Sequence, residues 1–354
     1  MSTINLYKWS EEELQIPKDR RLTFYKYQDL WQRVRSFRDE HGTLLVLKSV
    51  DPDNEQFARI ELRVLRRLLA ISSSRNHTIP VEIVPCNETS IIVMPWLIEV
   101  TFLPWHSLDT LMDVIWQVLQ GLEFMHENGI AHFDIHTTNL VVCRKPSVPT
   151  SPFQVQESRC YLIDFGSSKE LPPPPRGSHG NICVPLLPMG GHYVPPEGED
   201  SVNPYAYDIY CTGQTALSMC YKASLYAVHI PRNGRVRVPP ALWMFCEILS
   251  NNDPRMRPTA SQSMTLLQIV SRWNKMTQWL YWFAPYHVAD GVNLFGLRYI
   301  IWLVYSMKQR TRNRRVVHWM QRVQVPYIYR VIFFTYSTLL HSIVPLYLRP
   351  QSNI

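Results

Sequence analysis

The stretch GIAHFDIHTTNLVV, residues 129–142, decides the fold of this chain. An apolar run leads into His132, Asp134 and Asn139, and a second apolar, β-like run follows them. Histidine, aspartate and asparagine at these spacings are compatible with a metal site, a catalytic loop or a polar turn. The rest of the sequence has to separate these three alternatives.

Length and composition set the class of protein. The chain has 354 residues, 46% hydrophobic and 18% charged, which is enough for one large core or two medium ones and excludes wholesale disorder. Its seven cysteines lie at scattered spacings without a C-x-x-C pair, which indicates reduced thiols. Residues 1–21 are polar and lack the apolar segment of a signal peptide, so we expect a cytoplasmic protein.

Strand patterns come early in the chain and helix patterns come late. Residues 42–50 (GTLLVLKSV) predict a strand, and 33–37 predict its hairpin partner. Further strands are expected at 78–86, 90–97, 139–142 and 160–164, and helices at 52–71, 109–128, from 207, at 240–250 and at 259–271. This order indicates an α+β fold with a small β-rich lobe and a larger α-helical lobe.

The polar residues of the opening stretch have counterparts elsewhere. Asp134 and Asn139 lie in a loop between a helix and a strand, and Asp164 ends another strand. Carboxylate and carboxamide oxygens are the ligands that Mg²⁺ prefers. Lys48 lies inside an apolar strand, where a lysine is costly unless it is paired, and Glu61 in the following helix is its natural partner.

Six segments, in this order, resemble the motifs of eukaryotic protein kinases, and the resemblance covers about residues 30–268. The segments are LLVLKSV (44–50), HFDIHTTN (132–139), DFG (164–166), YVPPE (193–197), DIYCTGQT (208–215) and NDPRMRPTA (252–260). The resemblance implies a bilobal fold, with an N-lobe at about 30–96 and a C-lobe at about 97–270. An N-terminal extension, 1–29, would precede it, and a helical tail, 271–354, would follow.

The resemblance also implies a role for each residue of the site. Lys48 would hold the α- and β-phosphates of ATP and pair with Glu61, and Asp134 would accept the proton of a protein hydroxyl. Asn139 and Asp164 would each hold a Mg²⁺ ion. The hinge that binds adenine would consist of Met94, Pro95, Trp96 and Leu97.

Other motif residues would support this site structurally. Glu197 would form an ion pair with Arg257, and Asp208 would brace the catalytic loop. An apolar column would connect the lobes through His132, Phe165 and Leu65.

Four departures from the kinase pattern bear on activity. Phe133 replaces an arginine that usually reads a phosphorylated activation loop, which predicts activity without that phosphate. His136 replaces the lysine that steadies the transferred phosphate. Residues 26–37 contain no glycine where the family has its phosphate loop, and Gly190 aligns with a threonine that contacts the catalytic aspartate.

Two functions from different classes follow from this pattern. The first is an ATP- and Mg²⁺-dependent protein kinase, directed at Ser or Thr of a protein substrate, with transfer to a small molecule as a variant. The second is a pseudokinase that binds nucleotide or acts as a scaffold. A zinc site of His126, His132 and His136, a surface position for Lys48, and simple turn capping by the acidic residues remain as alternatives.

The C-terminal tail is basic and aromatic. Residues 272–354 carry eleven Arg and Lys against one acid, Asp290, and five of those charges fall in KQRTRNRR (308–315). The uncharged run 331–348 is near the lower length limit for crossing a bilayer. Contact with an anionic membrane surface and a helical subdomain packed on the C-lobe are the two readings, and a nucleic-acid partner is not expected.

Overall fold

The computed structural model describes residues 6–51, 55–103, 107–144, 153–186, 193–226, 237–278, 280, 284–285, 287–296 and 298. The chain divides into two compact units. Residues 1–238 and 246–267 form the first unit, and residues 239–245 and 268–354 form the second. The candidate site lies entirely in the first unit.

A five-stranded antiparallel sheet forms one part of the first unit, with strand order β1-β2-β3-β5-β4. Its strands are β1 (Thr23–Tyr27), β2 (Val34–Arg38), β3 (Leu44–Val50), β4 (Glu82–Pro85) and β5 (Ser90–Pro95). β3 lies in the middle, so Lys48 is flanked by Val34 of β2 and Ile92 of β5.

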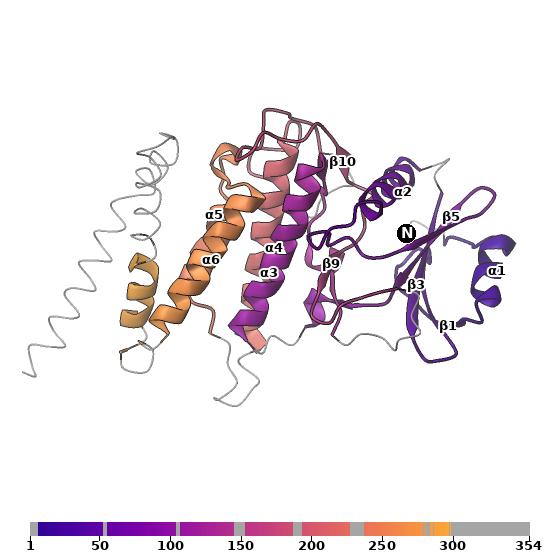
Figure 1. Ribbon diagram of the computed structural model, residues 1–354, viewed down its shortest axis with the longest axis horizontal. Helices are drawn as coiled ribbons and strands as arrows, with labels where there is room; N and C mark the ends of the chain where they lie inside the picture. Colours follow the sequence, from indigo (N-terminus) through magenta and orange to yellow (C-terminus); the bar gives the residue numbers. More distant parts are fainter. Residues whose placement is uncertain are drawn as a thin grey trace, which may run out of the picture. The chain divides into compact units, whose positions relative to one another are not determined.

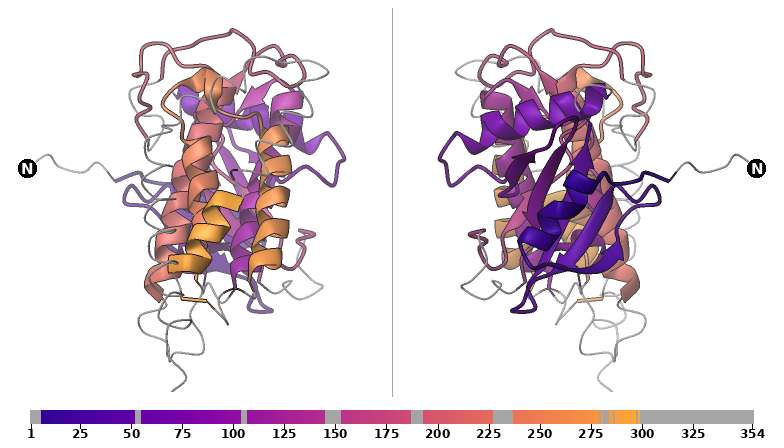
Figure 2. Two further views of the ribbon diagram at one scale, coloured as in Figure 1. Left: turned by 90° about the vertical axis from the view of Figure 1, so that its left-hand side faces the viewer. Right: turned by 90° about the vertical axis from the view of Figure 1, so that its right-hand side faces the viewer.

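The two faces of this sheet are covered by different helices. An apolar cluster gathers on one face: Trp9, Phe37, Leu45, Leu47, Ile91, Val93 and Phe153. Helix α1 (Glu11–Asp19) covers this face, with Ile16 packed against the cluster, and crosses the strands in the right-hand view of Figure 2. Because side chains alternate along a strand, Lys48 points to the other face, where α2 (Gln56–Leu69) lies.

Helices and short strands make up the rest of the first unit (Figure 1). Its helical elements include η1 (Val100–Phe102), α3 (Leu108–Glu127), η2 (Thr137–Asn139), α4 (Pro204–Tyr226) and η4 (Pro254–Met256), and α3 packs beside α4. Two small sheets carry the site loops, one of β6 (Ile98–Glu99), β8 (Leu140–Val142) and β9 (Cys160–Leu162), the other of β7 (Ile130–Ala131) and β10 (Lys169–Glu170). Helices α5 (Pro240–Leu249) and α6 (Ala260–Thr277) each contribute residues to both units.

The predicted α+β class, with a β-rich N-terminal part and a helical C-terminal part, is confirmed. The main predicted strands and helices are present, and Gly129 has the left-handed φ of 68° that ends α3. Sequence reasoning missed α1 and β1. Helix α1 has few apolar residues and contains Pro17, so its pattern is weak, and it begins at a capping box between Ser10 and Glu13.

The second unit contains a buried polar cluster. Asn293, within the helical residues 287–296, donates to Asn274 and Thr277 and accepts from the backbone N–H of Ala241. The basic run 308–315 and the uncharged run 331–348 lie outside the described residues, so their membrane contact stays a prediction. In the part of the chain that the structure describes, no helix is long and apolar enough to cross a bilayer.

Candidate active site

Lys48, Glu61 and Asp164 form the central ion cluster. The ammonium of Lys48 lies 2.8 Å from Oε2 and 2.9 Å from Oε1 of Glu61, and 3.1 Å from Oδ1 of Asp164. The predicted Lys48–Glu61 pair is therefore confirmed, and Lys48 is not a surface lysine. The side chain of Glu61 is buried, whereas that of Asp164 is 48% exposed, so the cluster opens to solvent on the Asp164 side.

The electrostatics of this cluster keep Lys48 and Asp164 charged. Burial acts to lower the pKa of Lys48, but the carboxylates of Asp164 and Glu61 outweigh it and raise that pKa. The charge of Lys48 lowers the pKa of Asp164. Burial raises the pKa of Glu61 more than Lys48 lowers it. At neutral pH the exposed edge of the cluster thus presents a cation beside a carboxylate.

Asp134 and Asn139 contact each other across the catalytic-loop stretch. The amide of Asn139 donates to Oδ2 of Asp134 at 2.8 Å and to its carbonyl at 3.0 Å. The hydroxyl of Thr215, from α4, donates to the carbonyl of Ile135 at 3.1 Å. These bonds fix the loop on both sides of the Asp134 side chain.

Asp208 of α4 holds the backbone of the same loop, as predicted. Its carboxylate accepts the backbone N–H of His132 and of Phe133, each at 2.8 Å, and contacts Nε2 of His126 at 2.9 Å. Phe133 has φ 69°, a conformation that L residues adopt rarely. Because Asp208 is fully buried and holds both N–H groups, it stabilises this strained turn.

The histidines of the opening stretch are structural. The ring of His132 is buried, lies 5.0 Å from the ring of Phe165 and contacts the carbonyl of Ile163 at 3.2 Å. Leu65 and Phe165 are also buried, as the predicted apolar column requires. Within the described residues no group of three or more His, Cys, Asp or Glu side chains is placed to hold a metal, which removes the zinc alternative.

His136 has a local structural role. It precedes η2, and its Nδ1 accepts the backbone N–H of Thr138 at 3.4 Å and contacts the Thr138 hydroxyl at 3.2 Å. Its ring also lies 5.4 Å from the ring of Tyr193. His136 thus joins the catalytic loop to the segment that precedes Glu197.

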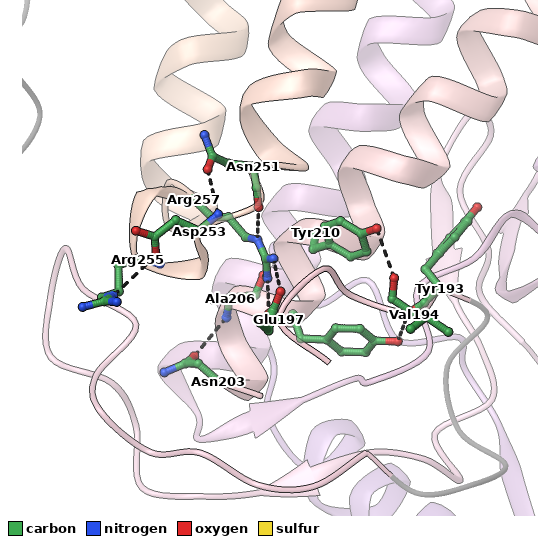
Figure 3. Close-up of polar contacts among 11 residues, drawn as sticks. Tyr193, Val194, Glu197, Asn203, Ala206, Tyr210, Asn251, Asp253, Arg255 and Arg257 are labelled. Atoms are coloured by element: carbon green, nitrogen blue, oxygen red, sulfur yellow. Dashed lines mark hydrogen bonds and ion pairs between the residues drawn. The ribbon is translucent and has the colours of Figure 1, made fainter. Parts of the chain in front are cut away.

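That segment is anchored by the predicted Glu197–Arg257 ion pair (Figure 3). The guanidinium of Arg257 donates to both Glu197 oxygens, at 2.5 and 2.8 Å, and to the carbonyl of Asn251 at 2.8 Å. The hydroxyls of two α4 tyrosines donate to consecutive carbonyls of the segment, Tyr207 to Tyr193 at 2.8 Å and Tyr210 to Val194 at 3.3 Å. Residues 193–197 are therefore held at several points against α4. Gly190 lies outside the described residues.

The predicted hinge begins within β5, which ends at Pro95, and continues through Trp96 and Leu97. Pro95 has no N–H, and the N–H of Trp96 donates to the carbonyl of Leu44 at 3.0 Å. Met94 and Leu97 pack against an apolar cluster, together with Val81, Val155 and Ile163; the cluster consists of Ile79, Val141, Cys143 and Tyr161. Pro95 and Trp96 thus offer no free N–H, which leaves Leu97 and also Met94, a sheet residue that lies opposite Val46 of β3.

The β1–β2 loop has no glycine, yet it is well fixed. The carboxylate of Asp29 accepts the N–H groups of Arg33 at 3.3 Å and Val34 at 3.0 Å. The N-terminal segment holds the loop from outside, since Tyr7 N–H donates to the Trp31 carbonyl at 2.9 Å and the Trp9 indole donates to the Gln32 carbonyl at 3.1 Å. Gln32 takes the positive φ, 63°, that a glycine would take more easily.

The donor set fits a hard divalent cation. The carboxylate of Asp164 accepts from Lys48 through Oδ1 and is half exposed. The amide nitrogen of Asn139 is engaged by Asp134, which leaves the amide oxygen as its metal-binding atom. A carboxylate and a carboxamide oxygen suit Mg²⁺, which takes few protein ligands and shares the oxygens of a phosphate.

Sequence reasoning missed several supporting residues. His126, Thr215 and Trp9 all bond to site elements far away in the sequence. For His126 and Thr215 the signal was their place in motif-bearing helices, but no spacing rule names their partners. For Trp9 the sequence carried no signal.

Comparison with known proteins agrees with this geometry. Proteins named "Dual serine/threonine and tyrosine protein kinase" from Xenopus laevis and Homo sapiens align over 174 residues, at 24% and 22% identity. The aligned part covers 46% of this chain and only 17% of each relative. A family model described as protein kinase domain matches residues 64–274, more than half of the chain. This chain belongs to the protein kinase domain family.

Proposed function

We propose that this chain is an active protein kinase that transfers the γ-phosphate of ATP to a hydroxyl of a protein substrate, with Mg²⁺ as the cofactor. The observation that carries the proposal is the double contact of Lys48, which reaches Glu61 and Asp164 together. This arrangement holds a cation and a metal-binding carboxylate side by side before any ligand binds. Phosphoryl transfer depends on such positioning of charge more than on covalent chemistry.

The other residues complete the chemistry. The ammonium of Lys48 would neutralise charge on the α- and β-phosphates, and Asp164 and Asn139 would hold Mg²⁺, which would supply further positive charge at the phosphates. Asp134, oriented by the Asn139 amide, accepts the proton of the substrate hydroxyl. The purine of ATP would pack on the apolar side chains of Met94 and Leu97, which are supported by the cluster of Ile79, Val141, Cys143 and Tyr161.

Protein substrates are favoured by the anchored segment 193–197. Its backbone is held by Tyr207 and Tyr210 and its Glu197 side chain by Arg257, which gives a fixed surface beside the catalytic loop (Figure 3). We propose Ser and Thr as acceptors. The relatives carry names that include tyrosine, so tyrosine peptides belong in the same assay.

The second candidate is a pseudokinase that binds nucleotide or acts as a scaffold. The β1–β2 loop favours it, because the loop has no glycine and its Trp31 and Gln32 carbonyls are bound to the N-terminal segment. His136 also favours it. This residue replaces the lysine that steadies the transferred phosphate in the kinase pattern, and its Nδ1 contacts Thr138.

A thermal-shift titration with ATP, with and without Mg²⁺, tests nucleotide binding. We expect stabilisation that requires Mg²⁺ and disappears in Asp164→Asn, because that variant lacks the metal-binding carboxylate. Asp19→Asn, an exposed carboxylate at the end of α1, is the matched control and should behave as wild type. Absence of any ATP effect on the wild type contradicts the kinase and leaves a scaffold that binds no nucleotide.

Transfer of label from [γ-³²P]ATP to Ser, Thr and Tyr peptides then separates the two candidates. Asp134→Asn should keep Mg·ATP binding and lose transfer by a factor on the order of 10² or more, because it removes the base. Binding without transfer in the wild type supports the scaffold instead.

A further inference from the structure

A second ion cluster, separate from Lys48, Glu61 and Asp164, joins α2 to β10. Glu170, the last residue of β10, accepts from Nε of Arg63 and, at 3.1 Å, from Nη1 of Arg67. Arg67 also donates to the carbonyl of Asn128, where α3 ends, at 2.6 Å. One carboxylate therefore ties two turns of α2 to the segment that follows Asp164.

The position of Glu170 is fixed by its backbone. β10 pairs with β7, with Glu170 opposite Ile130, and the next residue, Leu171, donates its N–H to the Gly129 carbonyl at 2.8 Å. A Cβ atom on Gly129 would lie 2.2 Å from the Leu171 carbonyl oxygen, so only glycine permits this close approach. The backbone that carries the Glu170 side chain is thus held by strand pairing.

The helix that Glu170 holds also carries Glu61. Arg63 and Arg67 follow Glu61 in the same helix, and the N-terminus of α2 has no side-chain cap. Any movement of α2 changes the distance from Glu61 to Lys48. The contacts of Glu170 therefore restrain the ion cluster of the active site through the helix.

Phe133 bears on the role of the Glu170 carboxylate. Phe133 stands where the kinase pattern has an arginine, and its ring packs on Tyr207 at 5.4 Å with the Lys169 ammonium 5.9 Å from its centre. This position is apolar and buried, so it offers no charge to a phosphate on the activation segment. The Glu170 carboxylate contacts the arginines of α2 without any added phosphate.

We infer that Glu170 is a positioning residue, which holds α2 through Arg63 and Arg67 and so keeps Glu61 paired with Lys48 without phosphorylation of the activation segment. The effect on ATP rests on the proposed function, but the effect on α2 does not. Hydrogen exchange of α2 and the Kd for Mg·ATP measure the two effects separately.

Glu170→Gln is the test variant, since it keeps the side-chain shape and removes the charge. Glu88→Gln, an exposed glutamate in the β4–β5 turn, is the matched control. Hydrogen exchange of full-length protein should show α2 amides exchanging about fivefold faster in Glu170→Gln, with α3 and α4 unchanged, because each exposed ion pair contributes about 1 kcal/mol or less. The Kd for Mg·ATP should rise by about the same factor, and Glu88→Gln should match wild type.

A charge swap separates positioning from general stability. Glu170→Arg alone should loosen α2 further, because it places a third cation beside two arginines. Glu170→Arg combined with Arg63→Glu should restore part of the α2 protection lost in Glu170→Arg, since the attraction is re-formed with reversed sign while Arg67 keeps its bond to the Asn128 carbonyl. A merely structural loss would not be rescued.

Each outcome has a separate meaning. Unchanged α2 exchange in Glu170→Gln, or failure of the charge swap to restore it, overturns the inference whatever ATP does. If the wild type binds no Mg·ATP, the proposed function fails, while the exchange data still decide the role of Glu170. Should Glu170→Gln fold poorly, Arg63→Gln gives the same test from the helix side.

Discussion

Two ion-pair centres of the first unit differ in their exposure to solvent. In the Glu197–Arg257 centre the arginine side chain is 0% exposed, and its remaining donors bond to the carbonyls of Asn251 and Ala206. In the Lys48–Glu61–Asp164 centre the aspartate is 48% exposed and keeps an oxygen toward solvent. A closed, fully bonded centre stabilises the fold, whereas an open one retains capacity for a ligand.

Removing Arg257 should give the largest effect. Arg257→Met leaves Glu197 and two carbonyls without their donor, and we expect a loss of about 3–5 kcal/mol in the free energy of unfolding. Urea denaturation measures it. Arg255→Met is the control, because the side chain of Arg255 is 90% exposed and its loss should cost about 0.5 kcal/mol or less. Equal losses in the two variants would erase the distinction between the centres.

The closed centre should also respond to acid through His179. Its Nε2 donates to the Arg257 carbonyl at 3.0 Å, and burial lowers its pKa to about 4. Between pH 6.5 and 4 the unfolded chain binds a proton that the folded protein does not bind, so stability falls as pH falls through this window. We expect a loss of about 2 kcal/mol at pH 4.5 that is absent in His179→Gln.

Urea denaturation at pH 7 and pH 4.5 checks this expectation. His41→Gln serves as the control, because the side chain of His41 is 51% exposed. A pH response in His179→Gln as large as in the wild type would assign the effect to other groups.

Replacing Lys48 in the open centre should weaken ligand binding and change how stability depends on pH. Lys48→Met removes the cation that faces the phosphates, and we expect Mg·ATP affinity to fall about tenfold or more, measured by calorimetry. Glu61 and Asp164 also lose their counter-charge, so the pKa of both carboxyls should rise. A raised folded-state pKa means that stability falls as pH rises, and the variant should lose stability from pH 5 to pH 8 relative to wild type.

Lys18→Met, on the exposed side of α1, is the control for both measurements. Wild-type affinity in Lys48→Met would remove Lys48 from the nucleotide site, and a wild-type pH profile would mean that its charge does not lower the pKa of the two carboxyls.

The smallest effect is expected at the brace on the β1–β2 loop. Trp9→Phe keeps an aromatic ring near Phe37 but loses the hydrogen bond to the Gln32 carbonyl. We expect about 1 kcal/mol of destabilisation and faster hydrogen exchange in residues 28–33. Trp31→Phe, with its side chain 59% exposed, should change neither quantity; an identical response in both variants would show that the indole bond does not hold the loop.

Sequence reasoning reached the ion cluster because its residues sit in contiguous motifs on strongly patterned elements. Lys48 within an apolar strand and Asp164 at a strand end are visible as local exceptions to hydrophobic patterning. The pairing of Lys48 with Glu61 followed from the cost of burying a lone charge.

Other contacts could not be predicted because they depend on tertiary packing. Glu170 looks like any charged residue of a short segment, and nothing in the sequence places it beside Arg63 and Arg67. Helix α1 is stabilised by a buried carboxylate, Glu13, which accepts from Tyr7, Ser10 and Thr89. A buried glutamate in a polar segment opposes the usual hydrophobic pattern, so pattern reasoning passes over it.

The covering of the sheet by α1 has a consequence for how this protein is produced. A recombinant fragment trimmed to the family-matched region, 64–274, would lack the sheet strand that carries Lys48. One that begins at residue 30 would keep that strand but leave Phe37, Leu45 and Leu47 without Trp9 and α1. An uncovered apolar sheet face favours aggregation. A trimmed fragment that fails to express, while a fragment from residue 6 expresses, would therefore reflect the loss of Trp9 and α1 from this face and not an unstable kinase domain.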